Sequence, residues 1–490
     1  MKILVVDLNN FSRYPTLPVG LIVAVLRHAG IGVQVLSPLA RGVPGYPRLT
    51  RAKPWDGLLD RMKYWSAVTP SRRVRALRRR AADALRPVDP SSREVIVGYA
   101  RELLESRPDA VLVSAYTMHE RTCDELAALC AATDVPLLIG GPYFSAREIV
   151  ERWTTKPGVT AVYGGEPEAV LPALVADLVA RRDLSRYAGV SVPGRVVAPA
   201  PPLHELDALP FADYTDFPWH RYPNRIVPIM TARGCEWARC RFCADVRTAA
   251  GRSFRSRSLD DVLHEIRHQR ALHDASLFVF LDLKLNSDVA LWRGLVDRLP
   301  DVAPGIRWTA SVHVDARDEN GLSRSDLMRA AQAGLTRITT GLESASEPLR
   351  KRMAKGTSLE RTAAYLRDAT EAGISVRLTT ILGYPGEEPA DVDTTARFLA
   401  DHAPWIERVM LNRYTLMLDS DDDRRFRTDP LPSVPIRPGA VDPLTAIVEH
   451  ENPTLATAAH RAAAYRLMAA VHAINRRPLL PKAQDFEGVM

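Results

Sequence analysis

The sequence of 490 residues has few cysteines and no long apolar run. No apolar stretch reaches the length of about 18 residues at which a transmembrane helix is indicated. Met1–Asp7 has the composition of a strand and resembles neither a signal peptide nor a membrane anchor. Three of the five cysteines fall within nine positions, which is unlike the spread pairs of a disulfide-rich secreted protein. We therefore expect a cytoplasmic protein without a membrane span.

Lysine is also scarce, because 57 of the 65 basic residues are arginine. The net charge of +7 and the arginine run at 71–80 raise the question of a nucleic-acid partner. The arginine excess extends over the whole chain beside abundant Ala, Val and Leu, which is typical of a compositional bias. We favour a solvated arginine-rich helix and do not expect nucleic-acid binding.

Residues 1–195 alternate short apolar runs with helical stretches, which predicts an α/β domain built on a doubly wound parallel sheet of the Rossmann type. The expected strands are Ile3–Val6, Val33–Leu36, Ala110–Ser114, Pro136–Ile139 and Val159–Tyr163. A helical insertion at about 38–90 interrupts this rhythm, and we expect it to cover one end of the sheet.

Residues 196–225 are rich in proline and read as a linker, after which residues 226–420 contain six further strand–helix units. The expected strands are Arg225–Met230, Leu277–Asp282, Ile306–Val312, Thr336–Leu342, Ser375–Leu382 and Arg408–Leu416. Six units are too few for a closed eight-stranded barrel and predict a partial, TIM-like (β/α)6 barrel. Residues 421–490 read as a small C-terminal extension with one amphipathic helix at about 456–476 that packs on the barrel.

Ligand loops are expected at the carboxyl ends of the strands in both parts. In the N-terminal part these are the loops Leu8–Pro18, Ala115–His119, Gly140–Ser145 and Gly164–Glu168. Glycines there would allow a bulky ligand to approach the backbone, although glycine at a strand end is often only a turn residue.

The most informative stretch is Arg233-Gly-Cys-Glu-Trp-Ala-Arg-Cys-Arg-Phe-Cys243, which follows the first strand of the predicted barrel. Cys235, Cys240 and Cys243 are too close together to be paired as disulfides without strain. No fourth Cys or His lies at zinc-ligand spacing, so a zinc site or a plain reduced loop is a weaker reading. Three soft thiolates suit a [4Fe–4S] cluster, because they bind three of its four irons and leave the fourth iron open to another ligand.

This motif resembles the cluster loop of the radical S-adenosylmethionine (SAM) superfamily, although its first gap has four residues where that family usually has three. The resemblance implies that Cys235, Cys240 and Cys243 bind the cluster and that its open iron binds SAM. It also implies SAM contacts from residues at the barrel's strand ends. These are Phe242, Gly341, Glu343, Ser344, Ile381 and Gly383.

A doubly wound domain placed ahead of such a loop is similar to the cobalamin-binding domain of the B12-dependent radical SAM family. By that resemblance the strand-end loops of residues 1–195 bind cobalamin. The implied contacts are Tyr116, Thr117, Gly140, Gly141, Tyr143, Gly164 and Glu166. The Asp-x-His-x-x-Gly pattern that supplies an axial histidine in other B12 proteins is absent after Asp7, and His119 reads as an ordinary surface histidine.

The resemblance implies a methyltransferase that acts on an unactivated carbon of a natural-product intermediate, through a 5′-deoxyadenosyl radical and methylcobalamin. Alternatives are a rearrangement, cyclisation or oxidation with the same cofactors, and a non-catalytic cobalamin-binding regulator. A methylthiotransferase is a weaker reading, because Cys123 and Cys130 look like buried helix residues and not further cluster ligands.

We expect a small-molecule, peptide or carrier-bound substrate and an electron donor such as a flavodoxin or ferredoxin, without assigning a catalytic residue. Polar residues after the second and third barrel strands could line the substrate space or serve the structure. They are Asp282, Lys284, Asn286, His313 and Asp315.

Overall fold

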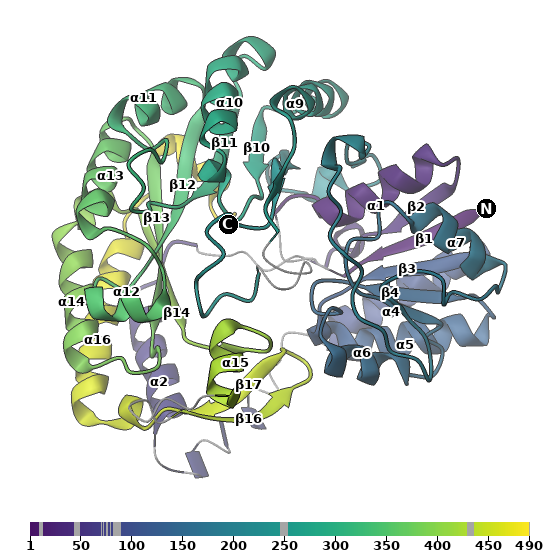
Figure 1. Ribbon diagram of the computed structural model, residues 1–490, viewed down its shortest axis with the longest axis horizontal. Coiled ribbons are helices and arrows are strands. Elements are labelled where there is room, and N and C mark those ends of the chain that lie inside the picture. Colours follow the sequence, from purple (N-terminus) through teal and green to yellow (C-terminus); the bar gives the residue numbers. More distant parts are fainter. Residues whose placement is uncertain are drawn as a thin grey trace.

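The computed structural model describes residues 1–8, 13–43, 50–69, 90–245, 253–428 and 436–489, with single positions between 71 and 81. Two six-stranded sheets organise these residues, and Figure 1 shows them side by side, with the N-terminal sheet facing the open side of a curved second sheet. Part of the predicted loop Leu8–Pro18 and of the arginine run at 71–80 lies outside the described residues.

The N-terminal sheet has the strand order β2-β1-β3-β4-β5-β6. Its strands are β1 Lys2–Asp7, β2 Gly32–Leu36, β3 Ala110–Ser114, β4 Leu137–Gly140, β5 Ala161–Tyr163 and β6 Val190–Ser191. The first five pair in parallel, and β6 adds an antiparallel edge. The chain reverses its direction of winding between β1 and β3, and this is where a doubly wound sheet opens its ligand crevice. The predicted Rossmann-like fold is confirmed.

Helices cover both faces of this sheet. They are α1 Leu17–His28, α4 Pro90–Leu104, α5 Glu120–Ala132, α6 Arg147–Thr154 and α7 Leu171–Val179. Cys123 and Cys130 are fully buried in α5, and burial raises the pKa of both thiols. The prediction that these two cysteines are core residues is confirmed.

The second sheet is entirely parallel, and its strands follow one another in chain order, as predicted for a partial barrel. They are β7 Ile226–Ile229, β10 Leu277–Phe280, β11 Arg307–Val312, β12 Leu335–Glu343, β13 Ser375–Leu382 and β14 Arg408–Arg413. The outer helices are α9 Leu259–His273, α10 Val289–Val302, α11 Arg324–Gln332, α12 Glu347–Met353, α13 Leu359–Glu371 and α14 Pro389–Asp401. A short ribbon of β8 Ala232–Arg233 and β9 Arg255–Ser256 follows β7.

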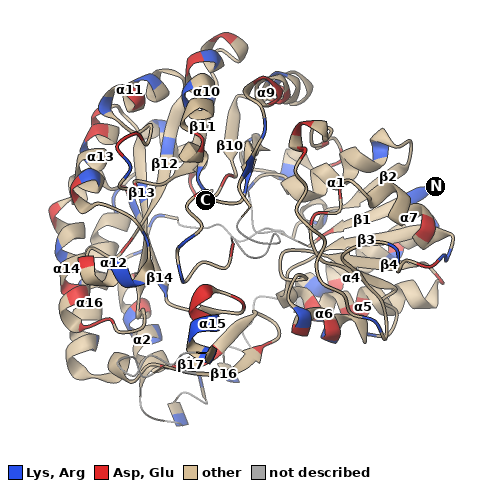
Figure 2. Cartoon of the chain, in the orientation of Figure 1, with Lys and Arg blue, Asp and Glu red and all other residues tan. Residues whose placement is uncertain are grey.

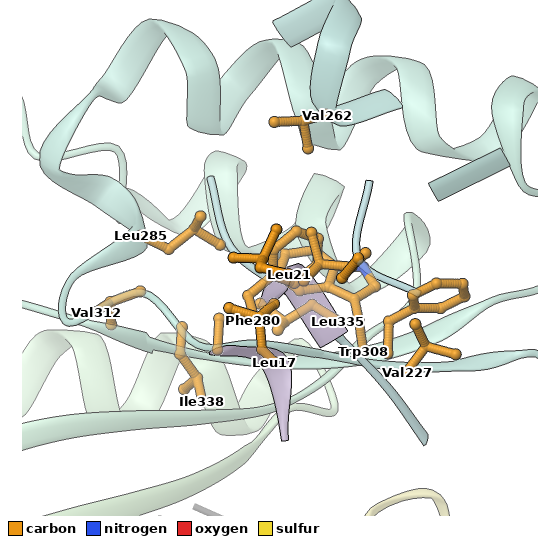
Figure 3. Packing of buried hydrophobic residues seen from close by; sticks show 14 of the residues in the cluster. Leu17, Leu21, Val227, Val262, Phe280, Leu285, Trp308, Val312, Leu335 and Ile338 are labelled. Atoms are coloured by element: carbon orange, nitrogen blue, oxygen red, sulfur yellow. The ribbon is translucent and has the colours of Figure 1, made fainter. Parts of the chain in front are cut away.

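One apolar core joins the two sheets. Figure 3 shows Leu17 and Leu21 of α1 beside barrel residues such as Phe280 and Trp308. Tyr214, from the predicted linker, is fully buried and donates a hydrogen bond from its hydroxyl to the Pro228 carbonyl at 2.9 Å. The aromatic residues of this segment therefore fill the space between the two sheets.

Among the described residues of the helical insertion, helix α2, Asp56–Val68, does not cover the N-terminal sheet, although we had expected this of the segment. It packs on α16, Ala458–Asn475, at the outer side of the barrel. Tyr64 is buried there, and its hydroxyl lies 3.0 Å from Nδ1 of His460. Nothing in the local sequence of α2 identifies so distant a partner.

The C-terminal extension contains α15 Asp421–Thr428 and a small antiparallel sheet besides α16. The strands of this sheet are β15 Leu416–Met417, just before the extension, β16 Arg437–Asp442 and β17 Ile447–Glu451; the sequence predicted only a helix in this region. Figure 2 shows the acidic start of α15 between the barrel and the N-terminal sheet. The amphipathic face predicted for α16 is buried, as expected for a helix that packs on the barrel.

The last described residues close the amino-terminal end of the barrel. Buried Arg337 and Arg377 donate hydrogen bonds of 2.8 and 2.9 Å to the carbonyls of Phe486 and Val489. Short 3-10 helices complete the described structure: η1 Pro38–Arg41, η2 Thr117–His119, η3 Leu206–Ala208, η4 Trp219–Arg221, η5 Leu285–Ser287, η6 Ala403–Trp405, η7 Pro453–Ala456 and η8 Pro481–Phe486. Among the described helices, none combines the length and the apolarity that a membrane span requires.

Candidate functional site

The three clustered cysteines lie in the loop that leaves the carboxyl end of β7 and the short strand β8. Cys235, Cys240 and Cys243 are partly exposed, and none forms a disulfide. Burial raises the pKa of the Cys240 thiol, whereas the nearby Lys355 ammonium lowers it. Within the described residues, no three His, Cys, Asp or Glu side chains are grouped so that they could hold one metal ion. The ligand role of the cysteines stays a prediction.

Asp282 fixes the start of this loop from the end of β10. Its buried carboxylate accepts hydrogen bonds from the backbone amide of Ala232 at 2.7 Å and from the Thr231 hydroxyl at 2.7 Å. The Thr231 amide also donates to it at 3.1 Å. Burial raises the pKa of Asp282 to about 6 despite these donors. Asp282 thus holds the backbone that leads into the cysteines.

The unusual four-residue gap between the first two cysteines is anchored on the loop that follows α12. Trp237 donates from its indole nitrogen to the Ala354 carbonyl at 2.9 Å, and its ring lies against Gly356. A Cβ at Gly356 would come within 2.1 Å of the Trp237 ring. The longer gap is therefore held in place by the contacts of Trp237 with Ala354 and Gly356.

Glu343 ends β12 in a left-handed conformation, with φ of 59°, where the pairing with β13 shifts register. Its carboxylate accepts a hydrogen bond from Lys355 Nζ at 3.0 Å and from the Thr379 hydroxyl at 3.2 Å. A Cβ at Gly341 would lie 2.1 Å from this carboxylate, so a larger residue there would displace the Glu343 and Lys355 side-chain ends. Glu343 thus forms an ion pair with Lys355, and its contact with SAM stays a prediction.

Lys355 links Glu343 to the cysteine loop. Burial lowers the pKa of Lys355, but the charges of Glu343, Cys240 and Cys243 more than offset this and raise it overall. The Lys355 ammonium also lies 6.0 Å from the centre of the Phe242 ring. Sequence reasoning did not single out Lys355, because it lies in a loop after a short helix and carries no motif signal.

The remaining predicted barrel positions also lie at strand ends. The Ser344 hydroxyl lies 3.2 Å from that of Thr395 on α14, so it serves the contact between strand and helix. Gly383, with φ of 89°, donates from its amide to the Glu387 carboxylate at 3.0 Å. Glu387 therefore holds this turn, and the neighbouring Glu388 caps the following helix α14.

Polar residues after β10 and β11 form an ion-pair network beside the four-residue gap. Asp315 is fully buried and pairs with Lys284 at 2.9 Å and with Arg317 at 3.0 Å. Arg317 and Lys284 also reach Glu236 of the cysteine loop, at 2.9 and 3.6 Å. His313 lies beside this network, and burial together with the neighbouring lysines lowers its pKa to about 2.

At the N-terminal sheet, Tyr116 and Tyr143 lie together at the carboxyl edge, with ring centres 6.3 Å apart. Thr117 is buried and donates from its hydroxyl to the Leu444 carbonyl of the C-terminal extension at 2.8 Å. His119 is half-buried, and burial lowers its pKa to about 4, so it is not an ordinary surface histidine.

Two of the three predicted glycines at this edge, Gly141 and Gly164, are required by packing. A Cβ at Gly141 would lie 2.0 Å from the Ala115 carbonyl, and one at Gly164 would lie 2.3 Å from that of Phe144. A Cβ at Gly140 would make only an ordinary contact, at 3.5 Å from the Tyr163 carbonyl oxygen. The close approach that the glycines permit is thus to neighbouring backbone, and contact of these loops with a corrin stays a prediction.

Glu166 and Glu168 join this edge to the barrel through ion pairs. Glu166 binds Arg255 at 2.7 Å and Arg233 at 3.1 Å, and Glu168 binds Arg233 at 2.6 Å. Burial alone would raise the pKa of Glu166, but the two guanidinium groups hold it below its usual range. The prediction that Glu166 contacts a cofactor did not anticipate this use of its carboxylate in docking the two sheets.

The carboxyl edge of the N-terminal sheet and the mouth of the barrel, which are the two candidate faces, meet across a second buried apolar cluster. Tyr143 from the N-terminal edge, and Phe242 and Ile381 from the barrel, all border it. Phe144 and Met353, one from each side, belong to its buried core. A pocket beside Arg233 opens at the same junction between α1, the linker and β7, and Leu17, Leu206 and Met230 line part of it.

Comparison with known proteins agrees with this geometry. Residues 229–399, which contain the cysteine loop and the strand ends of β10 to β13, match the radical SAM superfamily. This part of the chain is a radical SAM domain. It includes the six predicted cofactor-contact positions of the barrel and all three clustered cysteines.

Curated relatives of the chain include two methyltransferases, and also the anaerobic magnesium-protoporphyrin IX monomethyl ester cyclase of Rubrivivax gelatinosus, which is 26% identical over 65% of this chain and 59% of its own length. The uncharacterized methyltransferase PH0819 of Pyrococcus horikoshii is 27% identical over 59% of this chain and 64% of its own length. The bacteriochlorophyllide d C-12(1)-methyltransferase of Chlorobaculum tepidum is 24% identical over 59% of this chain and 60% of its own length. The chain therefore spans slightly less than two thirds of the length of these relatives.

Among solved structures, the radical SAM methyltransferase TsrM from Kitasatospora setae shares the fold of nearly the whole chain. The structure with tryptophan substrate and a SAM analogue gives a TM-score of 0.66 at 17% identity, over 96% of this chain and 89% of TsrM. The structure with cobalamin and a [4Fe–4S] cluster gives 0.65. The radical SAM domain and the N-terminal sheet are thus arranged in a known two-part fold.

Proposed function

We propose that the protein is a cobalamin-dependent radical SAM methyltransferase that acts on an unactivated carbon of a biosynthetic intermediate. The observation that carries this proposal is the meeting of the two candidate faces, since Tyr143, Phe242 and Ile381 border one apolar cluster. A methyl donor held at the N-terminal edge would then face a substrate activated at the barrel mouth. The methyltransferase relatives and the fold shared with TsrM support the same conclusion.

The residues of the cysteine loop fit a [4Fe–4S] cluster. Cys235, Cys240 and Cys243 are soft donors, they are partly exposed, and no disulfide occupies them. The Lys355 ammonium lies near Cys240 and Cys243, and its charge favours the thiolate form of Cys240, which is the form that binds metal. When bound, the cluster would supply one electron to SAM, and cobalamin would supply the methyl group.

The chain's own residues would position and shield these groups. Phe242 and Ile381 would form an apolar wall for the adenine of SAM, and the Gly383 turn, held by Glu387, would present its backbone. The Glu343–Lys355 pair would fix the polar side of the site. At the opposite edge Tyr143 and Tyr116 would flank the corrin, while Glu166 keeps the two sheets docked.

Partners follow from the proposed chemistry. The cluster would need an electron donor such as a flavodoxin or ferredoxin, and the substrate would be a small molecule, a peptide or a carrier-bound intermediate. Because a cluster of this kind and five free cysteines suit a reducing compartment, we place the protein in the cytoplasm.

The test is anaerobic reconstitution with iron, sulfide and hydroxocobalamin, followed by metal counting and mass spectrometry after SAM and a reductant are added. We expect about four irons and one cobalt per chain, and both 5′-deoxyadenosine and S-adenosylhomocysteine. A chain with Cys235, Cys240 and Cys243 replaced by alanine should lose the iron and 5′-deoxyadenosine. The matched control is Cys130→Ala, which removes a buried cysteine far from the loop in sequence.

Two outcomes would redirect the proposal. Iron, cobalt and 5′-deoxyadenosine without S-adenosylhomocysteine would favour a rearrangement or oxidation with the same cofactors. Unchanged iron content in the triple alanine chain would refute the assignment of the cysteines.

A further inference from the structure

Helix α2 presents an apolar stripe to solvent. Five large apolar side chains, one from the N-cap residue of α2 and four from the helix itself, are 41 to 64% exposed. They recur at helical spacing along one side of the helix. They are Trp55, Leu58, Leu59, Met62 and Trp65. The apolar stripe of a surface helix normally faces the core, so this arrangement is inverted. We call these five residues the α2 stripe.

The opposite face of α2 is fixed on the barrel, so the helix cannot turn its stripe inward. Tyr64 is 2% exposed and lies 3.0 Å, through its hydroxyl, from Nδ1 of His460. Gly57 lies against the His472 ring, where a Cβ would come within 3.2 Å. Just before the helix, the Ala52 amide donates to the Asn475 carbonyl at 3.0 Å. These contacts hold α2 along the length of α16.

Cations outnumber anions beside the α2 stripe. Lys53, Arg61 and Lys63 are exposed, and none of them forms an ion pair with a described residue. Two carboxylates, of Asp56 and Asp60, lie on the same helix. The balance beside the stripe is therefore slightly positive and favours a partner with negative charge.

The size and composition of the stripe decide between possible partners. A helix of 13 residues is about 20 Å long, and one such stripe is smaller than the roughly 800 Å² per partner of a stable protein interface. The small excess of cations beside the stripe also makes a second copy of the chain a less suitable partner than an anionic surface. Tryptophan at both ends of a leucine and methionine stripe, flanked by lysine and arginine, is typical of helices that lie in a membrane interface.

We propose that α2 docks the protein on an anionic lipid surface, with the α2 stripe inserted at the level of the headgroups. Leu58, Leu59 and Met62 would reach the acyl boundary, and Trp55 and Trp65 would lie at the interface. Lys53, Arg61 and Lys63 would contact the anionic headgroups. This inference does not depend on the proposed methyltransferase activity.

The experiment is co-sedimentation of the purified full-length protein with vesicles of phosphatidylcholine that contain about 30% phosphatidylglycerol. We expect binding that weakens with salt and weakens strongly on vesicles of phosphatidylcholine alone. The double variant Leu58→Ser with Met62→Ser should bind at least about tenfold more weakly, because two inserted side chains are lost. Both positions are exposed, so the variant should fold normally.

A matched control separates the stripe from general surface apolarity. Leu272 on α9 and Met328 on α11 are 48 and 40% exposed, so Leu272→Ser with Met328→Ser removes the same groups elsewhere. This control should bind vesicles as the unmodified chain does. Equal binding by all three proteins, or no vesicle binding by the unmodified chain, would overturn the proposal. A concentration-dependent dimer that the α2 variant abolishes would assign the stripe to self-association instead.

Discussion

Replacing Lys355 by methionine tests the polar centre of the barrel mouth. Lys355 Nζ lies 3.0 Å from Glu343 Oε1, and both side chains are about nine-tenths buried. Removing the cation leaves the Glu343 carboxylate in a low-dielectric site with the Thr379 hydroxyl as its remaining side-chain donor among the described residues. Breaking one partner of a buried ion pair costs about 3–5 kcal/mol of unfolding free energy, whereas an exposed pair contributes at most about 1 kcal/mol.

The assay is urea unfolding of the metal-free protein in a double-mutant cycle with Glu343→Gln. Each single variant should lose about 3 kcal/mol or more, and the double variant should lose clearly less than their sum, because no buried charge is then left alone. Additive losses, or a loss below about 1 kcal/mol for Lys355→Met, would show that the two groups do not act as a buried pair.

Three further changes test other parts of the structure. Burial raises the pKa of Asp422 to about 6, above its ordinary value near 4, so its ionisation should make unfolding easier by roughly 2 kcal/mol as pH rises from 4 to 7. Asp422→Asn should lack this fall in a pH series of unfolding measurements; an identical slope would refute the assignment. Phe486→Ala removes a fully buried ring from the closed end of the barrel and should cost about 3–5 kcal/mol by denaturant titration; a change below 1 kcal/mol would contradict that packing. Gly356→Ala should displace Trp237 and lower iron bound after reconstitution, whereas Gly373→Ala, also at positive φ but in open space, should not.

The sequence predicted most of the scaffold because its signals are local. The six barrel strands stand out as short apolar runs between amphipathic stretches, and each was placed within a few residues of its observed bounds. The small sheet of β15, β16 and β17 was missed, because two of its strands contain proline or alternate charges and carry no apolar pattern. The prediction was thus strongest where burial of one face gives the apolar residues a regular spacing along the chain.

Only part of the candidate site could be predicted from the sequence. Cysteine spacing and the glycine-containing strand ends named the loop and the positions around it, since such residues at such places have few other uses. Lys355 was missed, and Glu166 proved to be engaged in ion pairs with Arg255 and Arg233. Lysine and glutamate are common surface residues, so their partners become evident only when distant segments are brought together.

By itself the sequence determined the fold class, the order of the two sheets and the thiol-rich loop at a strand end, because these depend on periodicity and spacing. Only the tertiary structure decided how the parts face each other. It placed Tyr143 and Phe242 on one apolar cluster, paired Lys355 with Glu343, and carried α2 across to α16 with its apolar stripe outward. These contacts join residues from 12 positions apart, in the Glu343–Lys355 pair, to 396 apart, in the Tyr64–His460 contact of α2 with α16; they depend on the packing of whole elements, and no local pattern records them.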